Sequence, residues 1–198
     1  MGIFFTSDSH FGHGNIIKYC KRPFLSVEEM DAEMIRRWNR VVKANDIVYH
    51  LGDFTLLGAK KAAEYFLQLN GKIRILGTTW HHDKKWLPRC NIKDGNLLLP
   101  KLGRTDFISA SGHHVVVLPA LFVLEIAGLG DNGNSQVVVL CHYPLAVWDR
   151  KHYGAWHLHG HSHGSYENDG LSLDVGVDCN QFRPVSLEDV VGKMRAHV

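Results

Sequence analysis

The sequence predicts an α/β fold, because short apolar segments alternate with helical patterns in the first part of the chain. Residues 3–7, 46–51 and 73–76 are rich in β-branched and aromatic side chains, which is typical of strands. The segments between them, one opened by a capping box at Ser26 and one over residues 59–69, carry apolar residues three or four positions apart. This order predicts parallel strands joined by right-handed crossovers. Acidic and histidine side chains follow the strands, at the edge where such sheets bind ligands.

The composition bounds the size and class of the protein. The chain has 198 residues, of which 45% are hydrophobic and 21% charged, and this predicts a single globular domain over residues 1–198. The formal net charge is +2, so the sequence lacks the strongly basic character of a dedicated duplex nucleic-acid-binding protein. It shows no signal-peptide pattern and no apolar run of membrane-spanning length, so we expect a cytoplasmic protein outside the membrane. The four widely spaced cysteines are expected to be reduced thiols, and the oligomeric state is left open.

The first predicted strand leads directly into two candidate metal ligands. Asp8 and His10 are two residues apart, so in an extended segment their side chains leave the same face. The glycine-containing loop that follows carries Asn15 and Arg22. We interpret these two residues either as groups that bind a substrate phosphate or as groups that fix the loop.

The next two strands also end in chemically active side chains. Asp53 follows the second strand, and the pair His81 and His82 follows the third, with Asp83 next in the chain. Since the carboxyl ends of parallel strands lie at one edge of a sheet, Asp8, Asp53 and His82 are expected to lie near one another.

Four further strands are predicted in the second half of the chain, over residues 121–127, 136–140, 155–159 and 171–177. An Asp-Asn-Gly-Asn turn joins the first two into a hairpin. The second of these strands leads to His142, and the third leads into a run that contains His161 and His163. Residues 84–114 show no clear pattern, and Ser186 is expected to cap a terminal helix.

Carboxylates and imidazoles at these strand ends are suited to hold two metal ions. Asp53 is the natural bridge, because a carboxylate can bind one cation with each of its oxygens. Mixed nitrogen and oxygen ligands favour manganese, iron, zinc, nickel or cobalt over magnesium, and of these metals we expect manganese. Two such cations about 3.5–4 Å apart acidify a bridging water and neutralise the oxygens of an in-line phosphoryl displacement. The pattern therefore predicts phosphoester hydrolysis, whereas His50, His157 and His159 are interpreted as core or supporting histidines.

Five motifs occur in an order that resembles the calcineurin-like metallophosphoesterases. They are Asp8-x-His10, Gly52-Asp53, the His82-Asp83 element, His142 and Gly160-His161-Ser162-His163. The longer matches over residues 7–13, 49–53 and 142–144 resemble a small bacterial and phage branch of that superfamily. The resemblance covers residues 3–190 apart from about 88–135. It implies a four-layer sandwich of two mixed β-sheets flanked by helices.

The resemblance also implies two sets of metal ligands. The first metal ion would be held by Asp8, His10, Asp53 and His163. The second would be held by Asp53, an asparagine, His142 and His161.

The chain departs from the family pattern at the asparagine. Where the family has Gly-Asn-His-Asp, this sequence has three additional residues between Gly77 and the histidine pair. Either His81 occupies the asparagine position and His82 is the transition-state histidine, oriented by Asp83, or Thr78 replaces the asparagine and the second ion binds loosely. We favour His81, because imidazole is the better donor for these metals.

These implications predict a metal-dependent phosphoric ester hydrolase. A metal-bridging hydroxide would attack phosphorus in line, and His82 would stabilise or protonate the leaving oxygen. The expected substrate is a small phosphoester or nucleotide, with phosphodiesters preferred to monoesters. One alternative is a catalytically inactive scaffold of the same fold that binds a protein partner. Another is a dinuclear hydrolase of peptide or amide bonds.

Overall fold

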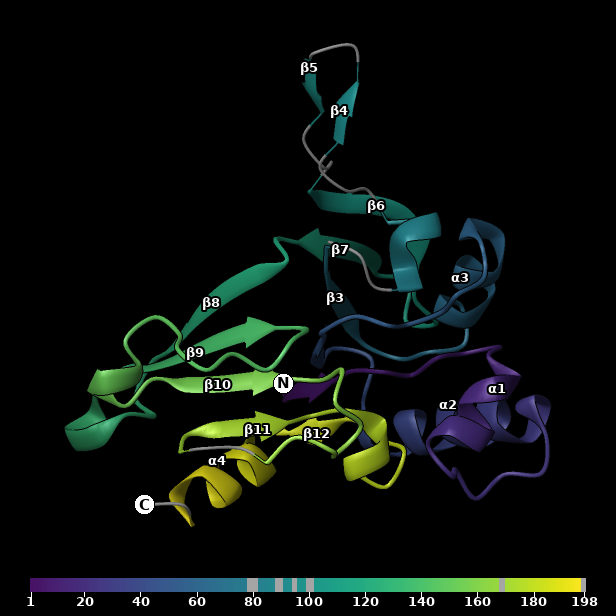
Figure 1. Ribbon diagram of the computed structural model, residues 1–198. Helices are drawn as coiled ribbons and strands as arrows, with labels where there is room; N and C mark the ends of the chain where they lie inside the picture. The colour runs from purple at the N-terminus through teal and green to yellow at the C-terminus, as the bar shows by residue number, and fades with distance from the viewer. Residues whose placement is uncertain (78–81, 88–90, 94–95, 99–101, 168–169, 197–198) are drawn as a thin grey trace.

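The computed structural model describes residues 1–198 except 78–81, 88–90, 94–95, 99–101, 168–169 and 197–198. Within the described residues the protein is a mixed α/β structure with two mixed sheets, a small hairpin and four α-helices (Figure 1). None of the described helices combines the length and the apolar character that crossing a membrane requires.

The larger sheet has six strands in the order β12-β1-β2-β3-β7-β6. They are β1 (Ile3–Thr6), β2 (Ile47–His50), β3 (Lys72–Leu76), β6 (Gly103–Ile108), β7 (His114–Leu118) and β12 (Val185–Ser186). The central strands β1, β2, β3 and β7 are parallel, which confirms the predicted direction of the first three strands. The two edge strands, β12 and β6, run antiparallel to their neighbours.

The smaller sheet has four strands in the order β11-β10-β9-β8. They are β8 (Leu121–Ile126), β9 (Gln136–Cys141), β10 (Trp156–His159) and β11 (Ser172–Asp174). The first two form the predicted antiparallel hairpin, and the last three are parallel. The strand predicted over residues 171–177 is shorter in the structure, because the chain turns after Asp174 toward a 3₁₀ helix.

The helices are α1 (Gly14–Tyr19), α2 (Val27–Val41), α3 (Ala59–Phe66) and α4 (Leu187–Arg195). Four 3₁₀ helices accompany them, namely η1 (His82–Lys85), η2 (Asp131–Gly133), η3 (Lys151–Tyr153) and η4 (Val177–Cys179). Both predicted N-caps are confirmed, because the hydroxyls of Ser26 and Ser186 accept hydrogen bonds from backbone N–H groups at 3.2 and 3.1 Å. The helix predicted over residues 59–69 ends earlier, at Phe66, and a turn follows it.

The unassigned segment 84–114 contains strands that sequence patterns do not reveal. The strands β4 (Asn91–Lys93) and β5 (Asn96–Leu98) form a hairpin that extends away from both sheets (Figure 1). They are too short for alternation to be recognised. The pairing of β6 with β7 changes register between Arg104 and Ile108. Burial still alternates along β6, but the more buried positions include Gly103 and Thr105, so the sequence shows no alternation of apolar side chains.

Two apolar layers hold the sheets in place. On one face of the larger sheet, Trp38 of α2 and Phe66 of α3 pack against a core that includes Ile73 of β3. On the opposite face, Phe5 of β1 belongs to a second core, shared with Leu158 of the smaller sheet and with α4. The two sheets therefore pack against each other through this second core, and the carboxyl ends of β1 and β2 come close to those of β9 and β10.

Substituting Phe66 with alanine tests the first core. The side chain is fully buried and stacks on Phe54 with ring centroids 4.3 Å apart. We expect Phe66→Ala to lower the free energy of unfolding by about 3–5 kcal/mol, measured by chemical denaturation. Leu67→Ala is the matched control, because Leu67 is 58% exposed and its loss is expected to change stability by about 0.5 kcal/mol or less. Equal effects of the two substitutions would contradict this packing.

Candidate metal centre

Backbone hydrogen bonds join the first two loops that carry predicted ligands. The N–H groups of Asp8 and His10 donate to the carbonyl oxygens of Gly52 and Asp53 at 3.0 and 2.9 Å. Because β1 and β2 are adjacent and parallel, the two loops leave the sheet side by side. Asp8, His10 and Asp53 are consequently held at fixed relative positions.

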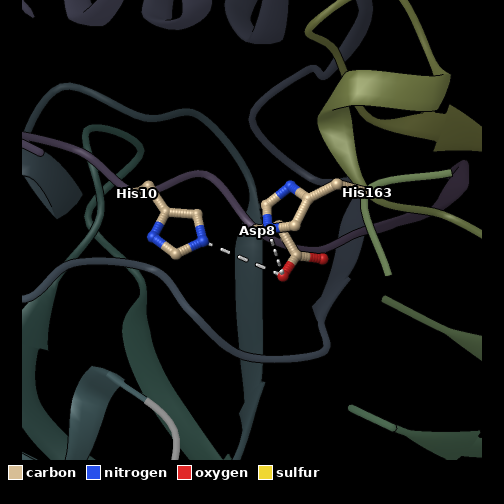
Figure 2. A group of neighbouring side chains, drawn as sticks. All are labelled: Asp8, His10 and His163. Atoms are coloured by element: carbon tan, nitrogen blue, oxygen red, sulfur yellow. Dashed lines mark ion pairs between the residues drawn. The ribbon is translucent and has the colours of Figure 1, made fainter. Parts of the chain in front are cut away.

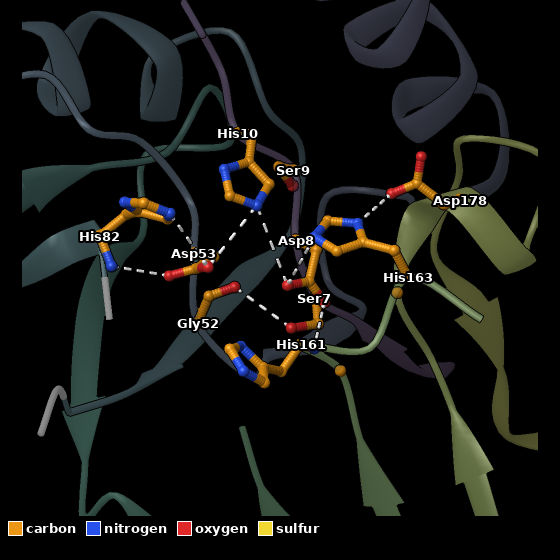
Figure 3. Close-up of polar contacts among 12 residues, drawn as sticks. Ser7, Asp8, Ser9, His10, Gly52, Asp53, His82, His161, His163 and Asp178 are labelled. Carbon is orange, nitrogen blue, oxygen red and sulfur yellow. Dashed lines mark hydrogen bonds and ion pairs between the residues drawn. The ribbon is translucent and has the colours of Figure 1, made fainter. Parts of the chain in front are cut away.

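Five predicted ligands have left-handed backbone conformations, which are uncommon for residues other than glycine. Their φ angles lie between 46° and 68°, and they are Asp8, His10, Asp53, His161 and His163. Each such conformation costs about 1–3 kcal/mol and persists where the surrounding structure enforces it. Figure 3 shows the side chains of these residues gathered around one small region. The strain at these five residues therefore lies where the predicted ligands converge.

The first donor group consists of Asp8, His10 and His163 (Figure 2). One ligand atom from each residue lies within 4.8 Å of the others. Asp8 Oδ1 is 4.0 Å from Nε2 of His10 and 4.0 Å from Nε2 of His163. Asp8 and His10 are buried, whereas the His163 side chain is 21% exposed. The group is therefore a largely enclosed set of one oxygen and two nitrogen donors.

The second donor group consists of Asp53, His142 and His161, again with donor atoms within 4.8 Å of one another. Nε2 of His142 lies 3.6 Å from Asp53 Oδ2, and Nε2 of His10, from the first group, lies 3.5 Å from the same oxygen. Asp53 therefore stands between the two groups, at the position predicted for a bridging carboxylate.

The chemistry of the first group fits a bound cation. Within the described residues, Asp8 Oδ1 and His10 Nε2 are buried atoms without a hydrogen-bond partner. Burial raises the pKa of Asp8 to about 7, and burial also lowers the pKa of His10 well below its usual value. A cation would supply both atoms with a partner and compensate the cost of burying the carboxylate charge.

His163 is oriented by a residue to which sequence reasoning assigned no role. Its Nδ1 lies 2.7 Å from Asp178 Oδ2, which leaves Nε2 facing Asp8 (Figure 3). Burial lowers the pKa of His163, but the hydrogen bond to Asp178 and the Asp8 carboxylate outweigh burial and raise that pKa overall. Asp178 thus fixes the ring in the orientation that a ligand to the first group needs.

The structure gives Arg22 the second of its two predicted roles, that of fixing the loop. Its guanidinium group donates to both carboxylate oxygens of Asp178 at 2.8 Å and to the backbone carbonyls of Asp8 and Ser9 at 2.8 and 3.0 Å. The residue is 4% exposed, so these partners rather than a substrate phosphate occupy its donors. Asn15 is exposed in the first turn of α1 and remains a candidate for substrate binding.

Two further carboxylates position the loops of the centre. Asp174 accepts hydrogen bonds from the hydroxyl of Ser162 at 2.6 Å and from the N–H of Gly164 at 3.1 Å, on either side of His163. Asp83 accepts hydrogen bonds from the N–H groups of the two residues that follow Asp53, at 2.9–3.1 Å. The sequence contains a signal for Asp174, because it ends an apolar strand at the same edge of a sheet.

His82 lies at the exposed margin of the centre. Its backbone N–H donates to Asp53 Oδ1 at 2.7 Å, and its Nε2 is 3.9 Å from Asp53 Oδ2. The side chain is 43% exposed and lies edge-on to the ring of His10. His81 and Thr78, the two candidates for the asparagine position, lie outside the described residues.

The histidines interpreted as structural make structural contacts. His50 shares a hydrogen bond of 2.9 Å with the hydroxyl of Ser9. His157 accepts from the N–H of Leu145 at 3.2 Å and lies 3.1 Å from a strand carbonyl, and burial lowers its pKa to about 4. His159 is likewise fully buried, beside the carbonyl of Gly160.

Comparisons with known proteins identify relatives and a fold neighbour. No family model matches the chain. It is 31% identical over 198 residues to the uncharacterized protein MJ1445 of Methanocaldococcus jannaschii, covering 96% of this chain and 89% of that protein. It is 27% identical over 192 residues to the Gene 66 protein of Mycobacterium phage L5, covering 88% and 86% of the two chains. The protein of unknown function AQ665 from Aquifex aeolicus shares its fold, with a TM-score of 0.60 and 18% identity over 97% of this chain and 98% of that one.

Substituting Gly160 tests the close approach of the last loop to the first. His161, the next residue, donates its N–H to Asp8 Oδ2 at 2.9 Å, and a Cβ atom on Gly160 would overlap that carboxylate oxygen and Ser7. We expect Gly160→Ala to lower the free energy of unfolding by about 1–3 kcal/mol in chemical denaturation. Gly192→Ala is the control, because a Cβ atom there meets no other atom within 4 Å. Unchanged stability of the Gly160 variant would contradict the described contact.

Proposed function

We propose that this chain, which belongs to the same family as the uncharacterized protein MJ1445, is a dinuclear metal-dependent phosphoesterase. The observation that carries the proposal is the position of Asp53. Its Oδ2 atom lies 3.5 Å from a histidine nitrogen of one donor group and 3.6 Å from a histidine nitrogen of the other. A carboxylate shared by two such groups is the arrangement that a bridging ligand of two cations requires.

We also infer the metallophosphoesterase fold, in which two mixed sheets form a four-layer sandwich with helices. Two features support this inference. The larger sheet is covered by α2 and α3 on one face and packs against the smaller sheet on the other. The five motifs that resemble the calcineurin-like superfamily lie at the carboxyl ends of strands in the two sheets or shortly beyond them.

Each donor group has a distinct ligand set in this proposal. Asp8, His10, Asp53 and His163 hold the first cation. Asp53, His142 and His161 hold the second, with a further ligand from the segment that contains Thr78 and His81. Nitrogen and oxygen donors in these proportions suit manganese, and also iron, zinc, nickel or cobalt. Two bound cations would acidify water and neutralise the charge of a phosphoryl group.

The protein's own side chains supply the remaining functions. His82 is exposed at the margin and held by its backbone to Asp53, so its ring can reach the leaving oxygen of a bound ester and stabilise or protonate it. Asp83 keeps the chain after Asp53 in place through its two backbone partners. We propose a small phosphodiester or nucleotide as substrate, with Asn15 of α1 available to contact it.

The convergence of the ligands favours an enzyme over a protein-binding scaffold of the same fold. A scaffold that had lost its chemistry would be expected to lack several donors. In this chain six of the seven predicted metal ligands lie in the two groups, and the seventh, His81, falls outside the described residues. Absence of both bound manganese and hydrolysis of phosphate esters would favour the scaffold.

Removing the shared carboxylate tests the dinuclear centre. We expect manganese-loaded protein to contain about two ions per chain, and Asp53→Asn to reduce this to fewer than about one, because both groups lose a charged ligand. Inductively coupled plasma mass spectrometry measures the content. Asp106→Asn, at an exposed position in β6, is the control and should keep its metal. Full metal content in the Asp53 variant would refute the bridging role.

Removing the imidazole at the margin tests the proposed chemistry. We expect His82→Ala to lower the turnover of bis-p-nitrophenyl phosphate by about 10²–10⁴-fold while the manganese content stays normal. A ring nitrogen of His82 lies within 4.8 Å of donor atoms of His10 and Asp53, but the proposal assigns it to the leaving oxygen, so its loss is expected to leave the metal in place. His152→Ala, at an exposed position in η3, serves as the control. Unchanged turnover in the His82 variant would show that another group stabilises the leaving oxygen.

A further inference from the structure

A further donor group lies on the outer side of His163, in addition to the first and second groups and to a set of His10, Asp53 and His82. It consists of the thiol of Cys20, a ring nitrogen of His163 and a carboxylate oxygen of Asp178, all within 4.8 Å of one another. The three residues come from distant parts of the chain, namely the end of α1, the loop after β10 and η4. Cys20 and Asp178 belong to neither the first nor the second donor group. The group therefore offers a sulfur, a nitrogen and an oxygen donor that the proposed phosphoesterase does not use together.

The group is prearranged by its surroundings. Both oxygens of Asp178 accept hydrogen bonds from Arg22 at 2.8 Å, so the carboxylate cannot rotate freely. His163 presents Nδ1 to Asp178 at 2.7 Å and Nε2 to Asp8, so its ring lies between this group and the first donor group (Figure 3). Cys20 is half-buried and the His163 side chain is 21% exposed, which leaves the group within reach of solvent.

The charge of the group suits a divalent cation with affinity for sulfur. Burial raises the pKa of the Cys20 thiol to about 11, so the thiolate forms only when a bound cation displaces the proton. That thiolate and the carboxylate of Asp178 then supply two negative charges, which exceed the single positive charge of Arg22. Sulfur, nitrogen and oxygen donors in one tetrahedral set are typical of zinc, whereas manganese prefers oxygen and nitrogen. Metal–ligand distances of about 2.0–2.3 Å hold the donors of one tetrahedral ion roughly 3.3–3.7 Å apart. Nδ1 of His163 and Oδ2 of Asp178, now 2.7 Å apart, therefore separate to admit the ion, and the Cys20 thiol, within 4.8 Å of both residues' donor atoms, completes the set.

We propose that Cys20, His163 and Asp178 form a separate inhibitory site for a thiophilic divalent cation such as Zn²⁺ or Cd²⁺. Binding there releases the Cys20 thiol proton to solvent and uses the lone pair of His163 Nδ1, so the ring proton lies on Nε2 and Nε2 has no lone pair for the first donor group. Occupation of the outer site consequently weakens the first cation site. The inhibitory consequence rests on the proposed phosphoesterase function, whereas cation binding does not.

Cobalt substitution tests the site without measuring activity. Cobalt(II) ligated by a thiolate gives an intense near-ultraviolet charge-transfer band, and neither the first nor the second donor group includes a cysteine. We expect this band when manganese-loaded protein is titrated with Co²⁺, and we expect Cys20→Ser to abolish it. Cys141→Ser and Cys179→Ser are the matched controls and should retain it. Absence of the band from the unmodified protein, or its persistence in the Cys20 variant, would overturn the site.

Zinc inhibition tests the coupling between the two sites. We expect Zn²⁺ to inhibit the manganese-loaded enzyme, and Cys20→Ser to raise the half-inhibitory concentration at least about 10-fold. Loss of a hydrogen-bonding partner behind a metal ligand already costs about 10–100-fold in affinity, and Cys20 is itself a ligand in this proposal. Equal inhibition of both proteins would mean that zinc acts by replacing manganese, and it would overturn the coupling. If the protein hydrolyses no phosphate ester, the proposed function fails, while the cobalt band still decides whether the outer site exists.

Discussion

The placement of the Asp53 carboxylate is the constraint on which the rest of the centre depends. Its Oδ2 atom lies within 3.6 Å of histidines from both donor groups, and its Oδ1 atom accepts the N–H of His82. Two separate sets of hydrogen bonds fix the chain around Asp53. The loop after β1 bonds to the carbonyl of Asp53 itself, and Asp83 binds the N–H groups of the next two residues. A shift of this residue would therefore change both groups at once.

Burial of the charged side chains is compensated by a chain of partners that reaches across the fold. Arg22 binds Asp178, Asp178 orients His163, and His163 faces Asp8. Burial raises the pKa of Asp178, but the hydrogen bonds from His163 and Arg22 outweigh burial and lower that pKa overall. This carboxylate is thus held in its charged form. The arginine touches Asp8 only at its backbone carbonyl, so it contributes to the donor geometry without contacting the donor atoms themselves.

The parts of the site that could be predicted are those encoded locally. Asp8, Asp53 and His142 each follow a strand directly, and parallel strands bring such residues to one edge of a sheet. The role of Arg22 could not be chosen from sequence, because its partner Asp178 is 156 residues away along the chain. Strand β6 escaped prediction because its more buried alternate positions, Gly103, Thr105 and Phe107, include only one large apolar side chain.

The left-handed donors have a consequence for any attempt to make this protein more heat-tolerant. Glycine adopts that backbone conformation at little cost. A screen for thermal tolerance alone would therefore favour glycine at positions such as Asp8 and His163, and the substitution would remove their metal-binding side chains. Robustness and chemistry are thus opposed at these positions. Gains compatible with chemistry have to come from places remote from the strand ends, such as Leu25, whose side chain is 98% exposed.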